Sequence, residues 1–405
     1  MRVFKNRSFT FIWIGNATSE LGGAFGTFCN SLLVYELTGS TMALGSMWLL
    51  YFLPSLVLQL VIGPYIDKWS RKWVMIIALW SRGLIFVLPL LAHLGDVLVP
   101  WHIYVVQLLI GLITPIYVPA NQAILPTIVP QKQLIQANAY VDGTVRLMTF
   151  MAPVTAGIVI EYIGISTTLF LICFLLVTSG FLVLFVNERR EKSTIRKRWV
   201  DEFNEGIRYF FKQRTIVWLG FFLAFVQFGV GVTMVINLPY VTDILGENYA
   251  MYGYFMAGFP LGYVVGTLLV GKILVSSRRL MMLGALVIGG LTYINLGITH
   301  SIDFAIITET IAGVVIAFFN VHNTTLCQQT VPNHLMGKVF SVRLLIIRGM
   351  MPLGILVGGL FSEWWGIRPL YILIGTIICL VSFIGILLPY FKFMDHPVKT
   401  QKTVS

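Results

Sequence analysis

Residues 129–164 read VPQKQLIQANAYVDGTVRLMTFMAPVTAGIVIEYIG, and residues 331–366 read VPNHLMGKVFSVRLLIIRGMMPLGILVGGLFSEWWG. Aligned without a gap, with Val129 opposite Val331, the two stretches are identical at seven positions. The identical residues are Val129, Pro130, Arg146, Met148, Gly157, Glu161 and Gly164 in the first stretch, and Val331, Pro332, Arg348, Met350, Gly359, Glu363 and Gly366 in the second. An arginine and a glutamate are both rare in apolar runs, so their recurrence at one offset indicates two related halves. Membrane transporters are often built from such halves.

The composition of the chain is typical of a membrane protein. Of its 405 residues, 57% are hydrophobic and 11% are charged, whereas a soluble protein has roughly 25% charged residues. A spanning helix needs about 20 mainly apolar residues. We predict an all-α membrane protein with twelve transmembrane helices in two pseudo-symmetric six-helix halves, and the alternating strands of a β-barrel are excluded. The predicted spans are residues 9–36, 42–64, 73–92, 101–123, 138–161, 167–187, 215–239, 249–271, 279–299, 303–322, 339–362 and 368–391.

The distribution of lysine and arginine predicts the orientation in the membrane. With both termini inside the cell, all but four of the 28 basic residues fall in inner loops or at the inner ends of spans. The exceptions are Arg82, Arg146, Arg348 and Arg368. Since inner loops are rich in basic residues, both termini are predicted to be cytoplasmic and the chain to cross the cell membrane many times. The net charge of +11 then follows from topology, and it does not indicate nucleic-acid binding.

The segment 187–214 is the one long polar stretch in the middle of the chain. Within it, Trp199, Phe203, Ile207 and Phe210 recur at helical spacing, which favours a short interfacial helix. A solvated, positively charged linker is an equally good interpretation. The predicted domains are an N-terminal six-helix half at 1–187, a cytoplasmic linker at 188–214 and a C-terminal six-helix half at 215–405.

The loop after the second predicted span contains a motif. Residues 63–72 read GPYIDKWSRK and match the pattern G-x-L-x-D-x-x-G-R-[RK] at Gly63, Asp67, Arg71 and Lys72. This pattern resembles the signature loop of the major facilitator superfamily. The resemblance implies that these four residues gate the inward opening by holding the loop against the other half.

A second stretch resembles one branch of that superfamily. Residues 119–130 read PANQAILPTIVP and are followed by an Ala-Asn pair at 137–138. They resemble the P-A-x-x-A-x-L-P-x-L-V-P…A-N pattern of drug:proton antiporters that include macrolide efflux proteins and the enterobactin exporter. The antiporter motif of the fifth span, G-x-x-x-G-P-x-x-G-G, is partly kept at 152–157. The resemblance implies gating roles for Pro153 and Gly157, a small-molecule substrate, and H+ as the coupling ion.

Polar side chains within the spans are candidates for function, because their burial in lipid is costly. Glu20 lies in the first span and Gln227 at the matching place in the seventh, while Gln107 in the fourth precedes Glu309 in the tenth by the offset of the repeat. In the superfamily that the chain resembles, these spans line the central cavity, so the four residues are predicted to line a substrate cavity. Glu20 and Glu309 are the predicted proton-coupling residues, since a carboxylate can bind a proton or a cationic substrate. A purely structural role for each acid is the alternative.

Charged residues near the ends of spans are predicted to act in gating. Asp142 and Arg146 are four residues apart, so they share a helix face and are expected to pair at the inner end of the fifth span. If that pair is buried, removing one partner costs roughly 3–5 kcal/mol. Arg348 has no acid near it in the sequence and is expected to reach Asp67 or another loop carboxylate. Arg82 also lacks a local acid, and a structural or gating role is favoured for it.

The sequence favours a secondary transporter that acts as a monomer in the lipid bilayer and exports an amphipathic small molecule, such as a drug or a siderophore-like metabolite, by proton antiport. A solute importer or uniporter on the same fold, and a transporter-like membrane sensor, are the alternatives. No GxxxxGK[ST], HExxH or GxSxG motif occurs, so no enzyme activity is expected. No cofactor or metal is expected, because the four cysteines lie in or beside spans without a CxxC pair.

Overall fold

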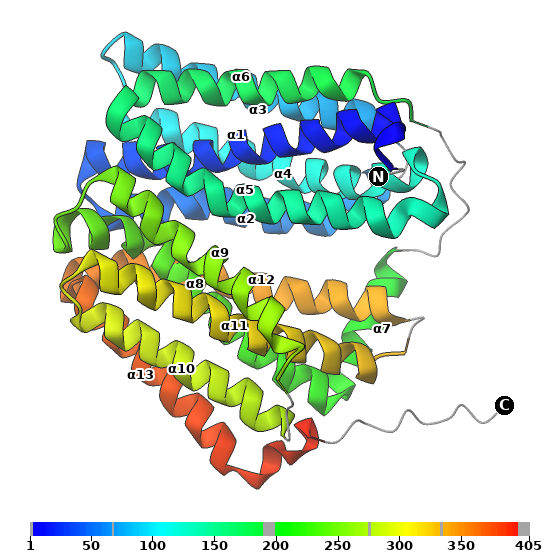
Figure 1. Cartoon of the computed structure of the whole chain (residues 1–405), viewed down its shortest axis with the longest axis vertical. Helices are drawn as coiled ribbons and strands as arrows, with labels where there is room; N and C mark the ends of the chain where they lie inside the picture. Colours follow the sequence, from blue (N-terminus) through cyan, green and yellow to red (C-terminus); the bar gives the residue numbers. More distant parts are fainter. Residues whose placement is uncertain (1–2, 67–68, 189–198, 274–276, 333–334, 396–405) are drawn as a thin grey trace. The chain divides into compact units, whose positions relative to one another are not determined.

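The computed structural model shows helices and no strands in the part of the chain that it describes (Figure 1). That part comprises residues 3–66, 69–188, 199–273, 277–332 and 335–395. Within these ranges, twelve long helices lie at the places of the twelve predicted spans. They are α1 (Arg7–Thr38), α2 (Thr41–Ile66), α3 (Arg71–Leu94), α4 (Pro100–Ile128), α5 (Leu134–Ile163), α6 (Ile165–Leu184), α8 (Arg214–Pro239), α9 (Tyr249–Val270), α10 (Arg278–Ile298), α11 (Ile302–Thr330), α12 (Met336–Trp365) and α13 (Ile367–Leu387).

Among the described residues, eleven helices are long and apolar enough to cross a membrane. Of the twelve long helices, α1 is the one not among them. Its sequence explains this, because Asn16, Thr18, Ser19 and Glu20 follow one another closely within the span. The prediction of an all-α membrane protein is confirmed, and α1 is the most polar of the twelve long helices.

The last helix is shorter than its predicted span of 368–391. α13 ends at Leu387, and Leu388 is extended, with φ −72° and ψ 120°. The residue before a proline is disfavoured in the α-helical region, so Pro389 explains this end. A 3-10 helix, η5 (Pro389–Met394), follows directly.

The repeat seen in the sequence also holds for the helix boundaries. The offset that aligns Val129 with Val331 also aligns the first and last residues of α4 with those of α11. The same offset aligns both ends of α5 with both ends of α12. Each of the latter two helices is followed by a glycine with positive φ, Gly164 at 103° and Gly366 at 85°. Because glycine adopts such a conformation without strain, the identity of these two residues has a structural cause.

The start of α3 is capped by the carboxylate of Glu188, which lies four residues after the end of α6. The Ser70 hydroxyl donates to Oε2 of Glu188 at 2.6 Å. The backbone amides of Arg71 and Lys72 donate to the same carboxylate at 3.1 and 3.3 Å. The first amides of a helix have no partner within the helix, and the helix dipole favours a negative charge there.

The start of α10 has the same arrangement. The Ser277 hydroxyl donates to Oδ1 of Asp395 at 2.8 Å, and the backbone amide of Arg279 donates to it at 2.9 Å. The Arg279 side chain adds an ion pair, with Nε 3.8 Å from Oδ2 of Asp395. The repeat therefore extends to side-chain caps on α3 and α10.

Contacts divide the chain into two compact units. Unit 1 comprises Met1–Ile195 and Val241–Ala257, and unit 2 comprises Arg196–Tyr240 and Gly258–Ser405. In unit 1, α1 contacts α5 and α6, and α3 contacts α4 and α6. In unit 2, α10 contacts α13, and α8 contacts α12. The predicted domain boundaries after residues 187 and 214 stay a prediction.

The short helix α7 (Trp199–Lys212) forms in the segment predicted as a linker. It packs on the start of α12, where Lys338 Nζ lies 2.6 Å from Oε2 of Glu205. A Cβ at Gly206 would lie 2.8 Å from the Lys338 carbonyl oxygen, so glycine allows the close approach. Phe210 of α7 is buried in the core of unit 2 together with Phe222 of α8.

Candidate substrate and coupling site

Three polar residues of α1 lie on one face of that helix. Asn16, Ser19 and Glu20 are three and four residues apart, the spacing of one helix face. The hydroxyl of Tyr117 from α4 lies 3.0 Å from Ser19 Oγ and 3.4 Å from Asn16 Oδ1. Asn16, Ser19 and Tyr117 are buried, whereas Glu20 is half-buried. The predicted site residue Glu20 therefore lies beside a buried hydrogen-bond network in unit 1.

Arg82 of α3 reaches the same place, which sequence spacing did not indicate. Its guanidinium carbon lies 5.8 Å from the centroid of the Tyr117 ring, and its charge acts on the Glu20 carboxylate. α1 permits this approach because residue 23 is glycine: a Cβ at Gly23 would lie 2.8 Å from Nη2 of Arg82. An acid of the first long helix and a cation of the third are thus neighbours within unit 1.

Several buried hydrogen-bond donors in unit 1 have no partner among the described residues. Those that belong to the residues around Tyr117 or to a predicted site residue are Nδ2 of Asn16, Nε of Arg82 and Nε2 of Gln107. A buried donor without a partner costs roughly 1–3 kcal/mol, so such groups call for an explanation, for example a bound water or ligand. Gln107, predicted to line the substrate cavity, is only 3% exposed.

Glu309, the predicted coupling residue of unit 2, has different surroundings. It is half-buried in α11, and a Cβ at Gly258 of α9 would lie 3.2 Å from the Cβ of Glu309. Its charge acts on the hydroxyl groups of Tyr240 and Tyr293. Within the described part of the chain, no cation acts on Glu309 as Arg82 acts on Glu20. One acid therefore has a cationic neighbour, and the other has tyrosine hydroxyls.

Gln227 is half-buried in α8 and contacts α12. Its Nε2 lies 3.4 Å from Sδ of Met351. A thioether sulfur is a weak acceptor, so this contact leaves most of the hydrogen-bonding capacity of the amide unused. Unit 1 thus contains Glu20 and Gln107, and unit 2 contains Gln227 and Glu309. The roles assigned to these four residues stay predictions.

The signature loop lies partly outside the described residues. Asp67 is outside them, and Gly63 lies in the last turns of α2. Arg71 and Lys72 form the first turn of α3, where Lys72 Nζ donates to a carbonyl oxygen in α6 at 2.7 Å. Glu188 caps this turn, a role that no sequence pattern indicated. Of the four predicted gating residues in the signature loop, Arg71 and Lys72 are therefore hydrogen-bonded to α6 or to Glu188, which follows it.

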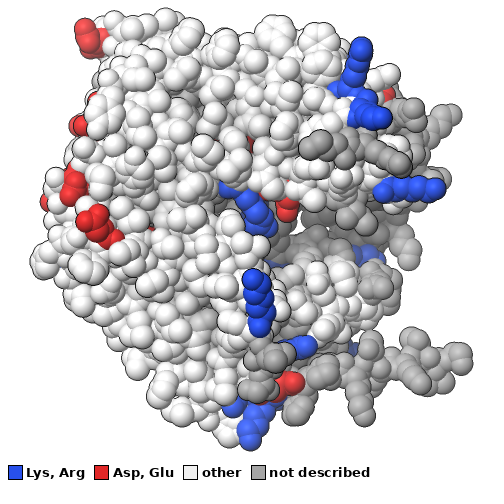
Figure 2. Space-filling model, in the orientation of Figure 1, with Lys and Arg blue, Asp and Glu red and all other residues white. Residues whose placement is uncertain are grey.

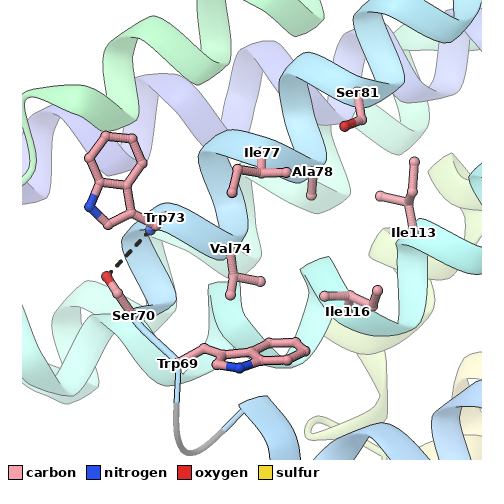
Figure 3. Close-up of a pocket in the computed structure, with 9 residues that line it drawn as sticks. All are labelled: Trp69, Ser70, Trp73, Val74, Ile77, Ala78, Ser81, Ile113 and Ile116. Atoms are coloured by element: carbon pink, nitrogen blue, oxygen red, sulfur yellow. Dashed lines mark hydrogen bonds between the residues drawn. The ribbon is translucent and has the colours of Figure 1, made fainter.

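An apolar pocket of about 350 Å³ lies beside this loop, between α3 and α4 (Figure 3). In the view, the Trp69 ring lies across one end, facing Val74 and Ile116, and Ser81 lies toward the other end. The lining residues are Trp69, Ser70, Trp73, Val74, Ile77, Ala78, Ser81, Ile113 and Ile116. None of them is charged, so the pocket does not supply a group for ion coupling.

Two of the four predicted gating residues of α5, Pro153 and Gly157, lie where that helix meets the start of α9. A Cβ at Gly157 would lie 2.4 Å from the carbonyl oxygen of Tyr249, and a Cβ at Gly253 would lie 2.4 Å from the carbonyl oxygen of Pro153. The two backbones touch there because glycine has no side chain. The backbone amide of Tyr249 also donates to Oε2 of Glu161 at 3.1 Å. A gating role for Pro153 and Gly157 stays a prediction. It would depend on this close contact between the backbones of α5 and α9.

The expected pair of Asp142 and Arg146 forms, with Arg146 Nη2 3.8 Å from Asp142 Oδ2. The two side chains are strongly exposed, at 55% and 77%. The expected pairing is therefore present, and for a pair exposed to this degree the interaction is worth about 0–1 kcal/mol rather than the energy of a buried pair. Arg348 is exposed on α12, and its expected partner Asp67 lies outside the described residues.

The two ends of the helices carry opposite charges. In unit 1, Arg7, Arg71 and Lys132 lie where α1, α3 and the turn before α5 begin, while Glu36 and Glu161 lie where α1 and α5 end. Figure 2 shows acidic side chains along its left edge, and lysine and arginine side chains in the middle and on the right. This separation agrees with basic residues at the inner ends of spans.

Comparison with known families decides the class of the protein. The model of the Major Facilitator Superfamily matches residues 12–352. The chain belongs to the major facilitator superfamily. Its fold and its class are therefore those of a multi-pass membrane transporter and not of an enzyme, as the sequence motifs indicated.

Three relatives of similar sequence are named as transport or efflux proteins. The chain is 23% identical over 391 residues to the MFS-type transporter YvqJ of Bacillus subtilis (strain 168), covering 94% of this chain and 92% of the relative. It is 23% identical over 389 residues to macrolide efflux protein A of Streptococcus pyogenes, covering 93% and 94%. It is 22% identical over 343 residues to the staphyloferrin A transporter of Staphylococcus aureus (strain NCTC 8325 / PS 47), covering 81% and 83%.

A solved structure shows the same fold. A mutant of the nucleoside transporter NupG matches with a TM-score of 0.76 and 14% sequence identity, covering 94% of this chain and 99% of that chain. At this identity, the likeness concerns the fold alone. The predicted resemblance to the superfamily, and to a branch with macrolide efflux proteins, is confirmed.

Proposed function

We propose that this transporter exports an amphipathic small molecule, such as a drug or a siderophore-like metabolite, by proton antiport. Membership of the superfamily supports the transport of a small molecule through a lipid bilayer. The names of two relatives, for macrolide efflux and for staphyloferrin A transport, support an amphipathic substrate. The observation that carries the proposal is one half-buried glutamate in each unit, Glu20 in α1 and Glu309 in α11.

In this proposal Glu20 and Glu309 carry the coupled proton. A charged carboxylate is unfavourable among apolar helices, so a proton or a cationic substrate group that neutralises it is bound there. Alternating access exposes such a site first to one side of the membrane and then to the other. If proton and substrate compete for one carboxylate, each is released as the other binds, and exchange results. Gln107 and Gln227 would offer uncharged hydrogen-bonding groups to the substrate.

The proposal includes an orientation and an assembly state. Both termini lie in the cytoplasm, and the protein works as a monomer in the cell membrane. The opposite charges at the two ends of the unit 1 helices support this orientation. The gating residues would lie in the signature loop, in the Asp142–Arg146 pair, at the α5–α9 crossing and in α12. Its proposed members are Gly63, Asp67, Arg71, Lys72, Asp142, Arg146, Pro153, Gly157 and Arg348.

Purified protein in liposomes with an imposed pH gradient tests the proposal, with a radiolabelled macrolide as the probe. An antiporter accumulates the macrolide in the acidic compartment, because protons leave that compartment as the macrolide enters. Protein-free liposomes measure the trapping of a weak base without a carrier. A symporting importer accumulates the probe in the alkaline compartment, and a uniporter or a sensor does not accumulate it beyond the protein-free level.

Two variants assign the coupling residues. Glu20→Gln is expected to abolish gradient-driven accumulation while part of the downhill exchange remains. Glu309→Gln is expected to weaken the binding of cationic substrates more than that of neutral ones. Asp303→Asn, at an exposed acid in the first turn of α11, is the matched control and should transport normally. Uphill transport by Glu20→Gln at the wild-type rate, with unchanged pH dependence, would place the proton site elsewhere.

A further inference from the structure

Two buried donors without partners lie around one side chain, Tyr117. Asn16 is 2% exposed, and its Nδ2 has no hydrogen-bond partner among the described residues, although its Oδ1 is 3.4 Å from the Tyr117 hydroxyl. Arg82 lies with its guanidinium carbon 5.8 Å from the Tyr117 ring centroid, and its buried Nε also lacks a partner in that part of the chain. Both atoms are N–H donors, so the group that satisfies them must be an acceptor.

The net charge around Glu20 and Arg82 differs from the charge that Glu20 would have without a cationic neighbour. A cavity with Glu20 alone would attract a cationic substrate. Arg82 acts on Glu20 with the opposite charge, so the formal charges of the two side chains cancel. The positive charge of Arg82 weakens the attraction of unit 1 for a cationic substrate and favours an anionic group beside it. Glu309 in unit 2 has no comparable cation among the described residues, so the two units differ in the ligand charge that they favour.

The glycine at residue 23 leaves room for the Arg82 guanidinium beside α1. A Cβ at Gly23 would lie 2.8 Å from Nη2 of Arg82, closer than side chains pack. Glu20 and Gly23 are three residues apart and so lie on one face of α1. The guanidinium therefore lies over the α1 backbone within one turn of Glu20, and Asn16 is one turn further along the same face.

We propose that Arg82 and Asn16 form a recognition site for a carboxylate group of the transported molecule. The proposal rests on the proposed transport function and specifies the substrate class: an amphipathic molecule that carries a carboxylate. A guanidinium binds a carboxylate through parallel N–H donors, and the amide nitrogen of Asn16 adds a third donor. Tyr117 offers its ring beside the guanidinium and its hydroxyl beside the amide. Arg82 is thus a substrate-binding residue as well as a neighbour of Glu20.

Three fluorescent probes that share one apolar ring system test this site. Dansylglycine carries a carboxylate, dansylglycinamide is its uncharged amide, and dansylcadaverine is cationic. Each is titrated against the purified full-length protein in detergent, and binding is read from the dansyl emission. We expect the wild-type protein to bind dansylglycine about tenfold more tightly than the amide, the effect of one charged hydrogen-bonding contact. Equal affinity for dansylglycine and its amide in the wild type would overturn the proposal.

Variants assign the preference to the named atoms. Arg82→Gln should lower the affinity for dansylglycine to that of the amide, and Arg82→Lys should keep part of the preference. Asn16→Ala should weaken dansylglycine binding alone. Gly23→Ala should also reduce the preference, because the added methyl group displaces the guanidinium. Lys132→Gln, at an exposed residue before α5, is the control and should bind all three probes as the wild type does.

The rival explanation is that Arg82 serves only as the counter-charge of Glu20. In that case Arg82→Gln weakens all three probes alike, and Glu20→Gln combined with Arg82→Gln restores them. Unchanged binding of the amide by Arg82→Gln shows that the variant is folded. These outcomes are separate from the proton-antiport test: loss of the carboxylate preference leaves macrolide accumulation in place, and absence of accumulation leaves the probe affinities unaffected.

Discussion

Asp395 occupies in unit 2 the position that Glu188 occupies in unit 1. The sequence separation of the two acids equals that of the serines whose hydroxyls donate to them, Ser70 and Ser277. Each carboxylate also accepts a backbone amide from the first turn of the third long helix of its half. The first half has a glutamate at this position and the second half an aspartate. The two halves therefore share the carboxylate group but not the length of the side chain.

We expect Glu188→Ala and Asp395→Ala each to lower the free energy of unfolding by about 0.5–2 kcal/mol, the usual effect of losing a helix N-cap. Glu188→Gln should have a smaller effect, because one acceptor oxygen remains. Thermal unfolding of the purified protein in detergent, followed by tryptophan fluorescence, measures the change. A Glu188→Ala protein that unfolds at the wild-type temperature would show that the cap does not stabilise α3.

The pair of Asp142 and Arg146 is expected to contribute little to stability. The side chain of Asp142 is 77% exposed and that of Arg146 is 55% exposed, so the coupling between Asp142→Ala and Arg146→Ala should stay below about 1 kcal/mol. A double-mutant cycle on the unfolding free energy measures this coupling, and raising the salt concentration should reduce it. A coupling of several kcal/mol that does not respond to salt would show that the pair is buried in the membrane protein.

Gly157→Ala is expected to disturb the crossing of α5 with the start of α9, where a Cβ would lie 2.4 Å from a carbonyl oxygen. Crowding of this kind destabilises by roughly 1–3 kcal/mol. Gly143→Ala in the same helix is the matched control, since a Cβ there has no atom within 4 Å. Thermal unfolding and macrolide transport of the two variants are compared. If they behave alike, the contact with α9 does not matter for stability or gating.

Single cysteines are expected to report the orientation, in a background without the four native cysteines. Positions 39–41 and 94–98 should react with a membrane-impermeant thiol reagent added to intact cells. Positions 67–71 and 190–200 should react only after the membrane is opened, because basic residues are concentrated on their side. Reaction of the 190–200 segment in intact cells would contradict cytoplasmic termini.

The positions of the helices could be predicted because spanning segments are specified locally. Twenty or so apolar residues form a helix wherever they occur in a bilayer protein. The two aligned stretches then pointed to a duplicated arrangement, and the boundaries of α4, α5, α11 and α12 keep the offset between those stretches. The end of α13 departs from the predicted span because the apolar run continues past Leu387, while Pro389 disfavours a helical conformation at Leu388.

The candidate site could be predicted only in part. Glu20 and Glu309 stood out because each is a single acid in an apolar span. Arg82 could not be assigned to Glu20, because their proximity depends on how α1 crosses α3, and the only local sign is the glycine at residue 23. The capping role of Glu188 could not be predicted, because its partner Ser70 is distant in the sequence and a charged residue after a span resembles any loop residue.

One helix, α9, belongs to both units. Its first turns, up to Ala257, count with unit 1, and the rest, from Gly258 onward, counts with unit 2. The boundary lies next to Gly258 and just before Pro260, which removes a backbone hydrogen bond inside the helix. Any displacement of one unit against the other must therefore either bend α9 near this point or separate its start from α5. Along its length, α9 thus contacts α5 in unit 1 through Gly253 and lies next to Glu309 in unit 2 through Gly258.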